Sequence, residues 1–174
     1  MKTKSEILHT PRLTLKSLSE PDRQQMVSIL CDETVKKTYM IPDFADPRQA
    51  EALFEKMMRL SQSSERFLYG VYHNDLLIGF VNDCEVKDLT MELGYVIAPA
   101  YQGKGFATEA VKACIGELFA MGFARVKAGF FEENIPSCRV MQKCGMHKID
   151  FEEDIEYKGI LRHCIYYVIE NSLS

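Results

Sequence analysis

The stretch Gln102-Gly103-Lys104-Gly105-Phe106-Ala107 lies between a strand-like run at residues 91–98 and a long amphipathic helical pattern at residues 107–121. At the start of a helix, free backbone N–H groups and the positive end of the macrodipole favour a bound anion. The two glycines have no Cβ, so the main chain can take unusual dihedral angles and come close to a ligand. The lysine between them adds a positive charge. The stretch therefore predicts a site for a phosphate group.

Two common phosphate-binding motifs do not fit this stretch. A Walker A loop requires Gly-x-x-x-x-Gly-Lys-Ser/Thr, and the chain contains no such sequence. The dinucleotide fingerprint Gly-x-Gly-x-x-Gly fails because Thr108 stands where its third glycine would be. A diphosphate of another kind is the predicted ligand.

Length and composition indicate one folded domain over residues 1–174. Hydrophobic residues make up 47% of the chain and charged residues 26%, which is ordinary for a globular protein. The net charge is −4 with no run of five like charges, so neither a nucleic acid nor a membrane surface is an expected partner. The sequence shows no signal-type apolar region and no apolar run of 18 residues, so we expect a cytoplasmic protein.

The cysteines and histidines show no pattern of metal ligands. The six cysteines form no C-x-x-C pair, and the four histidines have no H-E-x-x-H spacing. Most of the cysteines lie in apolar runs, which favours reduced, buried thiols over disulfides or zinc. We therefore expect no metal in the mechanism.

Hydrophobic periodicity predicts seven strands and four helices. The predicted strands are residues 12–16, 67–72, 76–84, 89–98, 125–130, 147–157 and 162–170. The predicted helices are residues 21–30, 47–61, 107–121 and 136–144. This order indicates a mixed α+β fold with a central, twisted, mostly antiparallel sheet of about seven strands and about four helices on its faces.

Several motifs in this order resemble the GCN5-related N-acetyltransferases (GNAT). They are Gln102-x-x-Gly105-x-Ala107, Asn134-x-x-Ser137 and Lys143-Cys144-Gly145-Met146, together with the order of elements. Thr10-Pro11-Arg12-Leu13-Thr14-Leu15-Lys16 and Glu92-Leu93-Gly94-Tyr95-Val96-Ile97 are similar to the ribosomal-protein alanine acetyltransferase (RimJ/RimL-type) branch. The resemblance covers nearly the whole chain.

The resemblance implies an N-acetyltransferase that takes the acetyl group from acetyl-CoA and gives it to an amine, either a protein N-terminus or a small molecule. The pyrophosphate would lie on the amides of residues 102–107, and the pantetheine arm would lie beside the strand that ends at Ile97. The residues expected to bind acetyl-CoA are Val96, Ile97, Ala98, Gln102, Gly103, Lys104, Gly105, Phe106, Ala107, Thr108, Asn134 and Ser137. The chain could also form a homodimer.

Acetyl transfer to an amine requires a neutral amine and a stabilised oxyanion. An α-amino group titrates near about 8, so a carboxylate acting directly or through water is a sufficient base. Glu92, on the strand expected to flank the thioester, is the first candidate; the alternative is an exposed or ion-paired strand glutamate. Asp83 and Glu85 are the second choices. A backbone N–H at Val96 or Ile97 would stabilise the oxyanion if this strand diverges from its neighbour.

Residues of the helix that follows Asn134 have two readings each. Asn134 caps the helix and, by the resemblance, also contacts the acetyl-CoA arm. Ser137 either helps to cap the helix or meets the sulfur of the cofactor as a catalytic group. Many GNAT members have a tyrosine general acid on this helix, and Met141 occupies the corresponding position here. A thiolate leaves readily, because a free thiol titrates near about 8.5, so water or Ser137 could supply the proton.

Two further residues and one further function are open alternatives. His163 is expected to be a strand or pocket residue, and Cys138 could carry an acyl group, although direct attack of the amine is simpler. A non-catalytic module that binds acyl-CoA as a sensor would show the same glycine-rich turn. It would have no need of Glu92 or Ser137.

Overall fold

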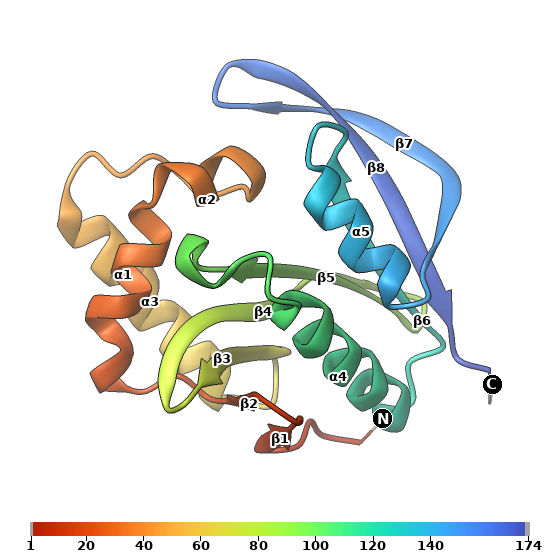
Figure 1. Cartoon of the computed structure of the whole chain (residues 1–174), viewed down its shortest axis with the longest axis horizontal. Coiled ribbons are helices and arrows are strands. Elements are labelled where there is room, and N and C mark those ends of the chain that lie inside the picture. The colour runs from red at the N-terminus through yellow and green to blue at the C-terminus, as the bar shows by residue number, and fades with distance from the viewer. Residues whose placement is uncertain (1, 173–174) are drawn as a thin grey trace.

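The computed structural model describes residues 2–172, and a sheet of eight strands forms its centre (Figure 1). The strands are β1 (Ile7–His9), β2 (Thr14–Lys16), β3 (Leu68–His73), β4 (Leu76–Lys87), β5 (Thr90–Ile97), β6 (Arg125–Phe131), β7 (His147–Tyr157) and β8 (Ile160–Glu170). Their order in the sheet is β1-β2-β3-β4-β5-β6-β8-β7. Every neighbouring pair is antiparallel except β5 and β6, which run parallel.

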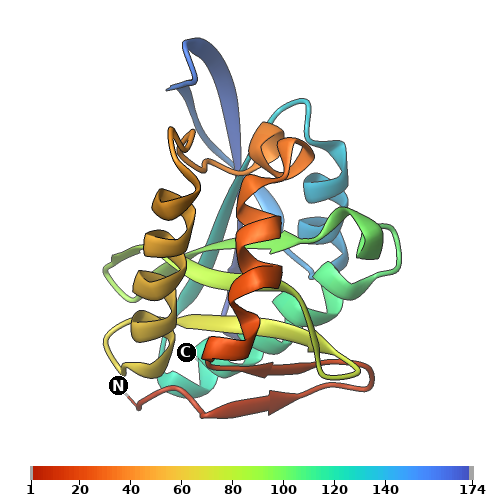
Figure 2. The same cartoon turned by 90° about the vertical axis from the view of Figure 1, so that its left-hand side faces the viewer.

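Helices cover both faces of this sheet. They are α1 (Arg23–Cys31), α2 (Glu33–Thr38), α3 (Pro47–Gln62), α4 (Phe106–Met121) and α5 (Ile135–Lys143), with 3-10 turns η1 (Glu20–Asp22) and η2 (Pro99–Tyr101). Figure 2 shows α1 and α3 side by side in front of the sheet. Their apolar side chains form one core with β3 and β4, and those of α4 form a second core on the opposite face.

The second core holds α4 in place below the end of β5. Ala110, Val111, Cys114 and Leu118 of the predicted apolar stripe are buried, and the helix ends at Gly122 in the left-handed conformation. Burying an aliphatic side chain contributes roughly 1.5–3 kcal/mol, so this stripe fixes the position of the first turn of α4. The phosphate-loop candidate before it is thereby anchored at its C-terminal side.

The predicted fold class is confirmed, although the structure has one strand and one helix more than predicted. The extra strand, β1, has only three residues, too few for an alternating pattern to show. The extra helix, α2, has six residues and begins at Asp32, whose side chain accepts from the N–H groups of Thr34 and Val35 at 2.8 and 3.0 Å. The predicted first helix begins at Arg23, because Pro21 lies in the preceding 3-10 turn.

A divergence of β5 from β6 opens the sheet at its centre. The parallel pairing runs from Thr90↔Arg125 to Glu92↔Lys127 and then stops, while β5 stays paired with β4 as far as Ile97. Figure 1 shows α4 on one side of β5, and α5 with the β7–β8 hairpin on the other. The divergence expected at this strand from the family resemblance is therefore present.

Candidate active site

A cavity of about 770 Å³ lies where β5 and β6 diverge. It runs from the start of α4, past β5 and α5, to α2 and β8. Its lining includes Glu92, Val96, Ile97, Gln102, Gly103, Gly105, Phe106, Ala107, Thr108, Asn134 and Ser137. Of the residues expected to bind acetyl-CoA, only Ala98 and Lys104 are missing from this lining.

The glycine-rich loop forms one end of this cavity. Gly103 and Gly105 have φ angles of +73° and +82°, which side-chain-bearing residues rarely adopt. Gly105 is the N-cap of α4, so the amides that follow are the free donors of a helix N-terminus. A Cβ on Gly103 would meet no atom within 4 Å, so the main chain is open on that side. This geometry fits a pyrophosphate.

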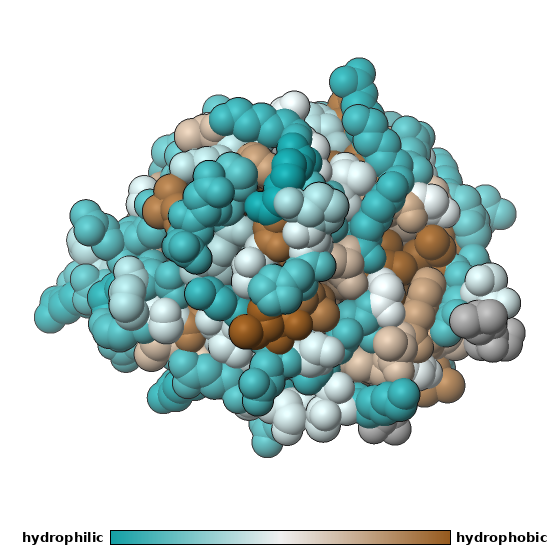
Figure 3. Space-filling model, turned by 60° about the horizontal axis from the view of Figure 1, so that its bottom comes forward, coloured by the Kyte–Doolittle hydropathy of each residue, from teal (hydrophilic) through white to brown (hydrophobic). Residues whose placement is uncertain are grey.

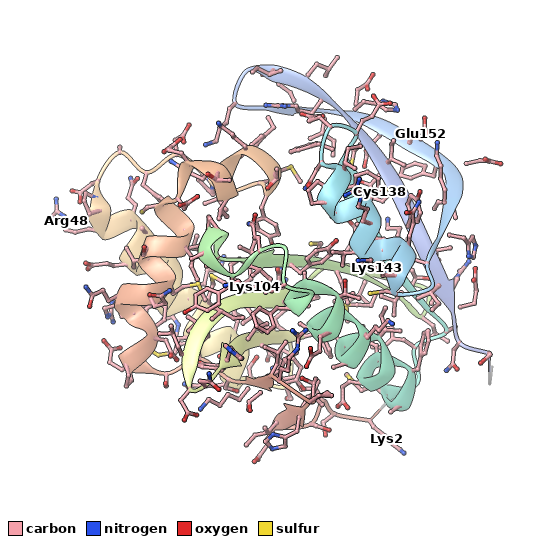
Figure 4. All side chains as sticks on the ribbon, in the orientation of Figure 1. Lys2, Arg48, Lys104, Cys138, Lys143 and Glu152 are labelled. Carbon is pink, nitrogen blue, oxygen red and sulfur yellow. The ribbon has the colours of Figure 1, made fainter. Side chains whose placement is uncertain are left out.

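Lys104 takes a different position from the one its sequence suggests. Its ammonium donates to the carbonyl of Ala100 at 3.0 Å and lies 5.3 Å from the centre of the Tyr101 ring. In Figure 4 it lies at the turn before α4, and it is not among the residues that line the cavity. Main-chain amides and the helix dipole are therefore the positive groups that face the cavity here.

The divergence of the strands leaves part of the β5 backbone facing the cavity. Ala98 N–H donates to the Ile78 carbonyl at 2.8 Å, and hydrogen bonds in an antiparallel pair alternate along the strand. The main-chain groups of Ile97 therefore point away from β4, and the Gln102 side chain binds its carbonyl at 2.8 Å. The N–H of Ile97 is thus the better oxyanion donor of the two that the sequence offered.

The first turn of α5 brings a hydroxyl pair to the cavity. Asn134 is the N-cap, because its Oδ1 accepts from Ser137 N–H at 3.3 Å. The Ser137 Oγ lies 2.6 Å from the hydroxyl of Tyr95 on β5. Burial raises the pKa of Tyr95 more than the hydrogen bond with Ser137 lowers it, so the phenol keeps its proton at neutral pH.

Two other residues of α5 point away from the cavity. Cys138 lies 3.5 Å from the hydroxyl of Tyr167 on β8 and is absent from the cavity lining (Figure 4). Met141 is fully buried in the core that also holds the apolar side chains of α4. The position that often carries a tyrosine acid in GNAT proteins is therefore a packing position here, and a phenol reaches Ser137 from β5 instead.

Glu92 lies at the opposite end of the cavity in an ion pair. Its Oε2 is 2.8 Å from Lys127 Nζ on β6, and the Lys127 ammonium is 4.8 Å from the centre of the Tyr166 ring. Burial lowers the pKa of Lys127, but its bonds to Glu92 and Glu85 outweigh that effect and raise it overall. The carboxylate lines the cavity whereas the lysine lies behind it.

The other carboxylates and the histidine expected near the site lie outside its lining. Asp83 is buried and bonds to Arg66 Nε at 2.5 Å, and Glu85 lies on the exposed part of β4. His163 is held between Asp154 and Glu152 of β7, at 2.8 and 3.0 Å. Glu92 is thus the one candidate base among these four residues that reaches the cavity.

Tyr95 and Arg12 were not singled out from the sequence. Tyr95 lies within a run of strand residues, and nothing local shows that its hydroxyl meets α5. Arg12 belongs to the N-terminal motif but contacts Glu109 and the Lys104 carbonyl, about ninety residues away. Only the folded arrangement identifies either of them.

Both the sequence and the structure match known acetyltransferases. The family model described as the acetyltransferase (GNAT) domain matches residues 12–147. The uncharacterized N-acetyltransferase YnaD of Bacillus subtilis is 32% identical over 152 residues, which cover 86% of this chain and 88% of that protein. The predicted enzyme class and the predicted cosubstrate, acetyl-CoA, are confirmed at the level of the family.

Solved structures agree with this chain over almost its full length. RimL, a ribosomal L7/L12 α-N-protein acetyltransferase solved with coenzyme A, superposes with a TM-score of 0.83 at 14% identity, covering 97% of this chain and 100% of that one. The ribosomal-protein-S5-alanine acetyltransferase of Vibrio fischeri gives 0.78 at 18% identity, covering 95% and 97%. At these identities the solved structures show only a shared fold. The family model over residues 12–147 and the 32% identity to YnaD show that this chain belongs to the GNAT acetyltransferase family.

Proposed function

We propose that the chain is a single N-acetyltransferase domain that moves the acetyl group of acetyl-CoA to a primary amine, either the α-amino group of a peptide or a small amine. The observation that carries this proposal is one continuous cavity with a phosphate-type loop at one end and the Glu92 carboxylate at the other. Its middle is the open edge of β5. The described part of the chain has no helix that could cross a membrane.

The residues present fit acetyl-CoA. Two glycines with positive φ expose the main chain before α4, and a pyrophosphate needs such donors. The amides of residues 103–107 would hold it, and β5 and α5 would flank the pantetheine arm. Bound acetyl-CoA supplies the activated thioester, and the rest of the chemistry is proton transfer and charge stabilisation by the chain.

Direct attack by the amine accounts for the residues at the cavity. The nitrogen–carbon bond forms as the carbon–sulfur bond breaks, and Ile97 N–H stabilises the charge that develops on the carbonyl oxygen. A carboxylate accepts several hydrogen bonds, so Glu92 can retain its ion pair with Lys127 and still take a proton from the amine. The sulfur leaves as a thiolate and takes its proton from Ser137 Oγ as Ser137 takes one from water, and the hydroxide formed is neutralised by the proton held on Glu92.

Tyr95 orients the Ser137 hydroxyl for this task. The protonated phenol can donate to Ser137 Oγ, 2.6 Å away, or to the Ser137 carbonyl, 3.3 Å away; when it donates to Oγ, the Ser137 proton is free to point into the cavity. Water restores the Ser137 proton in each turnover. Cys138 faces β8, so an acyl-cysteine route has no support in this arrangement.

Charged residues of both signs line the cavity. Glu92 and Glu133 are acidic, and Arg139 and Lys143 of α5 are basic. Next to Glu92, an acceptor ammonium group is attracted before it loses its proton.

A thiol-release assay with acetyl-CoA tests the proposal. The acceptors would be short peptides with N-terminal Ala or Ser, lysine-containing peptides blocked at the N-terminus, and small mono- and diamines. We expect release that depends on at least one acceptor class, with the acetyl group found on that amine by mass spectrometry. Tight binding of acetyl-CoA without acceptor-dependent release in the whole panel would instead indicate the non-catalytic sensor module.

A further inference from the structure

Arg12, just before β2, joins the N-terminal segment to the phosphate loop and the first turn of α4, more than ninety residues later in the sequence. Its Nε donates to Glu109 Oε2 on α4 at 2.7 Å, and its Nη1 donates to the Lys104 carbonyl in the phosphate loop at 2.9 Å. Its main-chain N–H donates to Glu109 Oε1 at 2.8 Å. The guanidinium also lies 4.6 Å from the centre of the Phe106 ring. Through Arg12, the N-terminal segment thereby contacts both the loop and the first turn of α4.

The bond to Lys104 fixes the direction of one loop amide. In a trans peptide the C=O and the following N–H point in opposite directions. Because Arg12 holds the Lys104 carbonyl, the N–H of Gly105 must point away from Arg12. Gly105 lines the cavity, so this N–H is turned toward the space where a phosphate would lie.

Hydrogen bonds hold the Glu109 carboxylate in position for its contacts with Arg12. It accepts from Thr10 Oγ1 at 2.6 Å as well as from Arg12, and its side chain is 15% exposed. Burial raises the pKa of Glu109, but the bonds from Thr10 and Arg12 outweigh it and lower the pKa overall. The carboxylate is therefore charged at neutral pH.

Stability alone is a weak reason for this arrangement. The Arg12 side chain is 45% exposed, and exposed ion pairs contribute only about 0–1 kcal/mol. Arg12 also makes a poor direct ligand for a phosphate, because Nε, Nη1 and Nη2 already face Glu109 or the loop carbonyl. What the contacts do produce is a defined orientation of the loop.

We propose that Arg12 is a positioning residue for the pyrophosphate of acetyl-CoA, which it serves by holding the Lys104 peptide against Glu109. The inference rests on the proposed function, since it assigns the loop to that ligand. This role requires two contacts of the guanidinium at once, one with Glu109 and one with the Lys104 carbonyl. A lysine at residue 12 keeps the charge but can form only one of the two contacts.

Isothermal titration of coenzyme A and of dephospho-coenzyme A, which lacks the 3′-phosphate, tests the inference. The proteins are wild type, Arg12→Ala, Arg12→Lys, and Lys16→Ala as a control. Lys16 is a basic residue at the end of β2, four residues after Arg12, and its ammonium lies over the Tyr72 ring. Thermal melting of each variant defines a temperature at which all of them are folded.

We expect Arg12→Ala and Arg12→Lys each to weaken both ligands by the same factor, about tenfold, as for the loss of one charge-assisted hydrogen bond. Lys16→Ala should leave both affinities unchanged. Hydrogen exchange at the amides of residues 103–107 should be faster in both Arg12 variants.

Three results would overturn the inference. Unchanged affinity in Arg12→Ala would mean that the contacts of Arg12 do not affect ligand binding. Wild-type affinity in Arg12→Lys would mean that a positive charge at residue 12 is enough for binding. A loss for coenzyme A without a loss for dephospho-coenzyme A would make Arg12 a direct 3′-phosphate ligand. If wild type binds neither ligand, the proposed function fails, and that outcome is distinct from these three.

Discussion

The donor end and the acceptor end of the cavity are built in different ways. The donor end is the loop at residues 102–107 and the first turn of α4, a contiguous piece of chain. The acceptor end is assembled from β5, α2 and the β7–β8 hairpin. The Tyr157 hydroxyl lies 2.7, 3.1 and 3.1 Å from the carbonyls of Lys36, Tyr39 and Ile41, and its single O–H can donate to any one of them, which links that hairpin to the end of α2.

The difference shows where sequence patterns carry functional information. At the donor end the backbone itself is the binding group, and backbone conformation is encoded locally by glycine. At the acceptor end, side chains from elements distant in sequence meet. The wall of the cavity there depends on how closely β5 approaches the end of α2. A Cβ on Gly94 would lie 2.9 Å from both Tyr39 Oη and Cys84 Sγ, so β5 and the end of α2 touch there.

Figure 3 shows the face that carries β1, β2 and α4 as mostly hydrophilic, with apolar surface in small patches. Exposed large apolar side chains occur both on β1, where Ile7 is 48% exposed, and at the tip of the β7–β8 hairpin, where Ile160 and Leu161 are 55% and 67% exposed. Exposed apolar surface therefore does not distinguish the two ends of the cavity.

The largest expected effect is at the donor end, from Gly105→Glu. At φ +82° a side chain is strained, and its Cβ would lie 3.3 Å from Arg12 Nη2. The new carboxylate would compete with Glu109 for Arg12 and bring negative charge beside the phosphate site. We expect coenzyme A affinity, measured by calorimetry, to fall at least about 100-fold.

Gly116→Glu is the matched control for this change. Gly116 lies on the exposed side of α4, where a Cβ would meet no atom within 4 Å. It should bind coenzyme A as wild type does. Wild-type affinity in Gly105→Glu would remove the loop from the binding site and break the contrast between the two ends.

At the acceptor end, Glu92→Gln should lower kcat without changing coenzyme A affinity. The amide is similar in shape but is a far weaker base, and general-base catalysis typically contributes 10²–10⁴-fold, so we expect a loss of about 100-fold. The loss should be greater for lysine amines than for α-amino groups, because lysine titrates about two units higher. Equal kcat in Glu92→Gln and wild type would reduce Glu92 to an ion-paired strand residue.

Between the two ends, Tyr95→Phe tests the hydroxyl pair. Removing the phenol oxygen leaves Ser137 free to rotate, and we expect kcat to fall about tenfold, with coenzyme A affinity unchanged. Ser137→Ala and the double variant should show similar losses, because the two groups act together. Cys138→Ala, next to Ser137 but facing β8, should retain wild-type kcat. Additive losses from Tyr95 and Ser137 would contradict the shared role.

These variants also separate what the sequence could predict from what it could not. The apolar stripe of α4 and the glycines before it follow local rules, so the helix, the loop and the family were predictable. The Tyr95–Ser137 and Glu92–Lys127 pairs depend on strand register and on the point where β5 leaves β6. No periodic pattern in the sequence predicts where β5 separates from β6. The helix α2 is also too short for a periodic pattern to show.

The smallest expected effect concerns His163 on the acceptor-end hairpin. The hydrogen bonds with Asp154 and then Glu152 raise its pKa above the usual 6.5. Its contribution to stability is therefore fully present below pH 6.5 and is lost as the pH rises through the higher, folded-state pKa. Between pH 6 and pH 8.5 the melting temperature of wild type should fall more than that of His163→Gln, by about one degree because the pair is exposed.

An NMR titration of the His163 ring measures the pKa directly. Asp154→Asn should lower it toward 6.5, whereas Asp150→Asn, an exposed change on the same strand, should not. Coenzyme A affinity should be the same on both sides of this titration, because the hairpin carries none of the donor-end groups. A change in that affinity with the charge of His163 would mean that the two ends are energetically coupled. Such coupling would have to pass through β8, which carries His163.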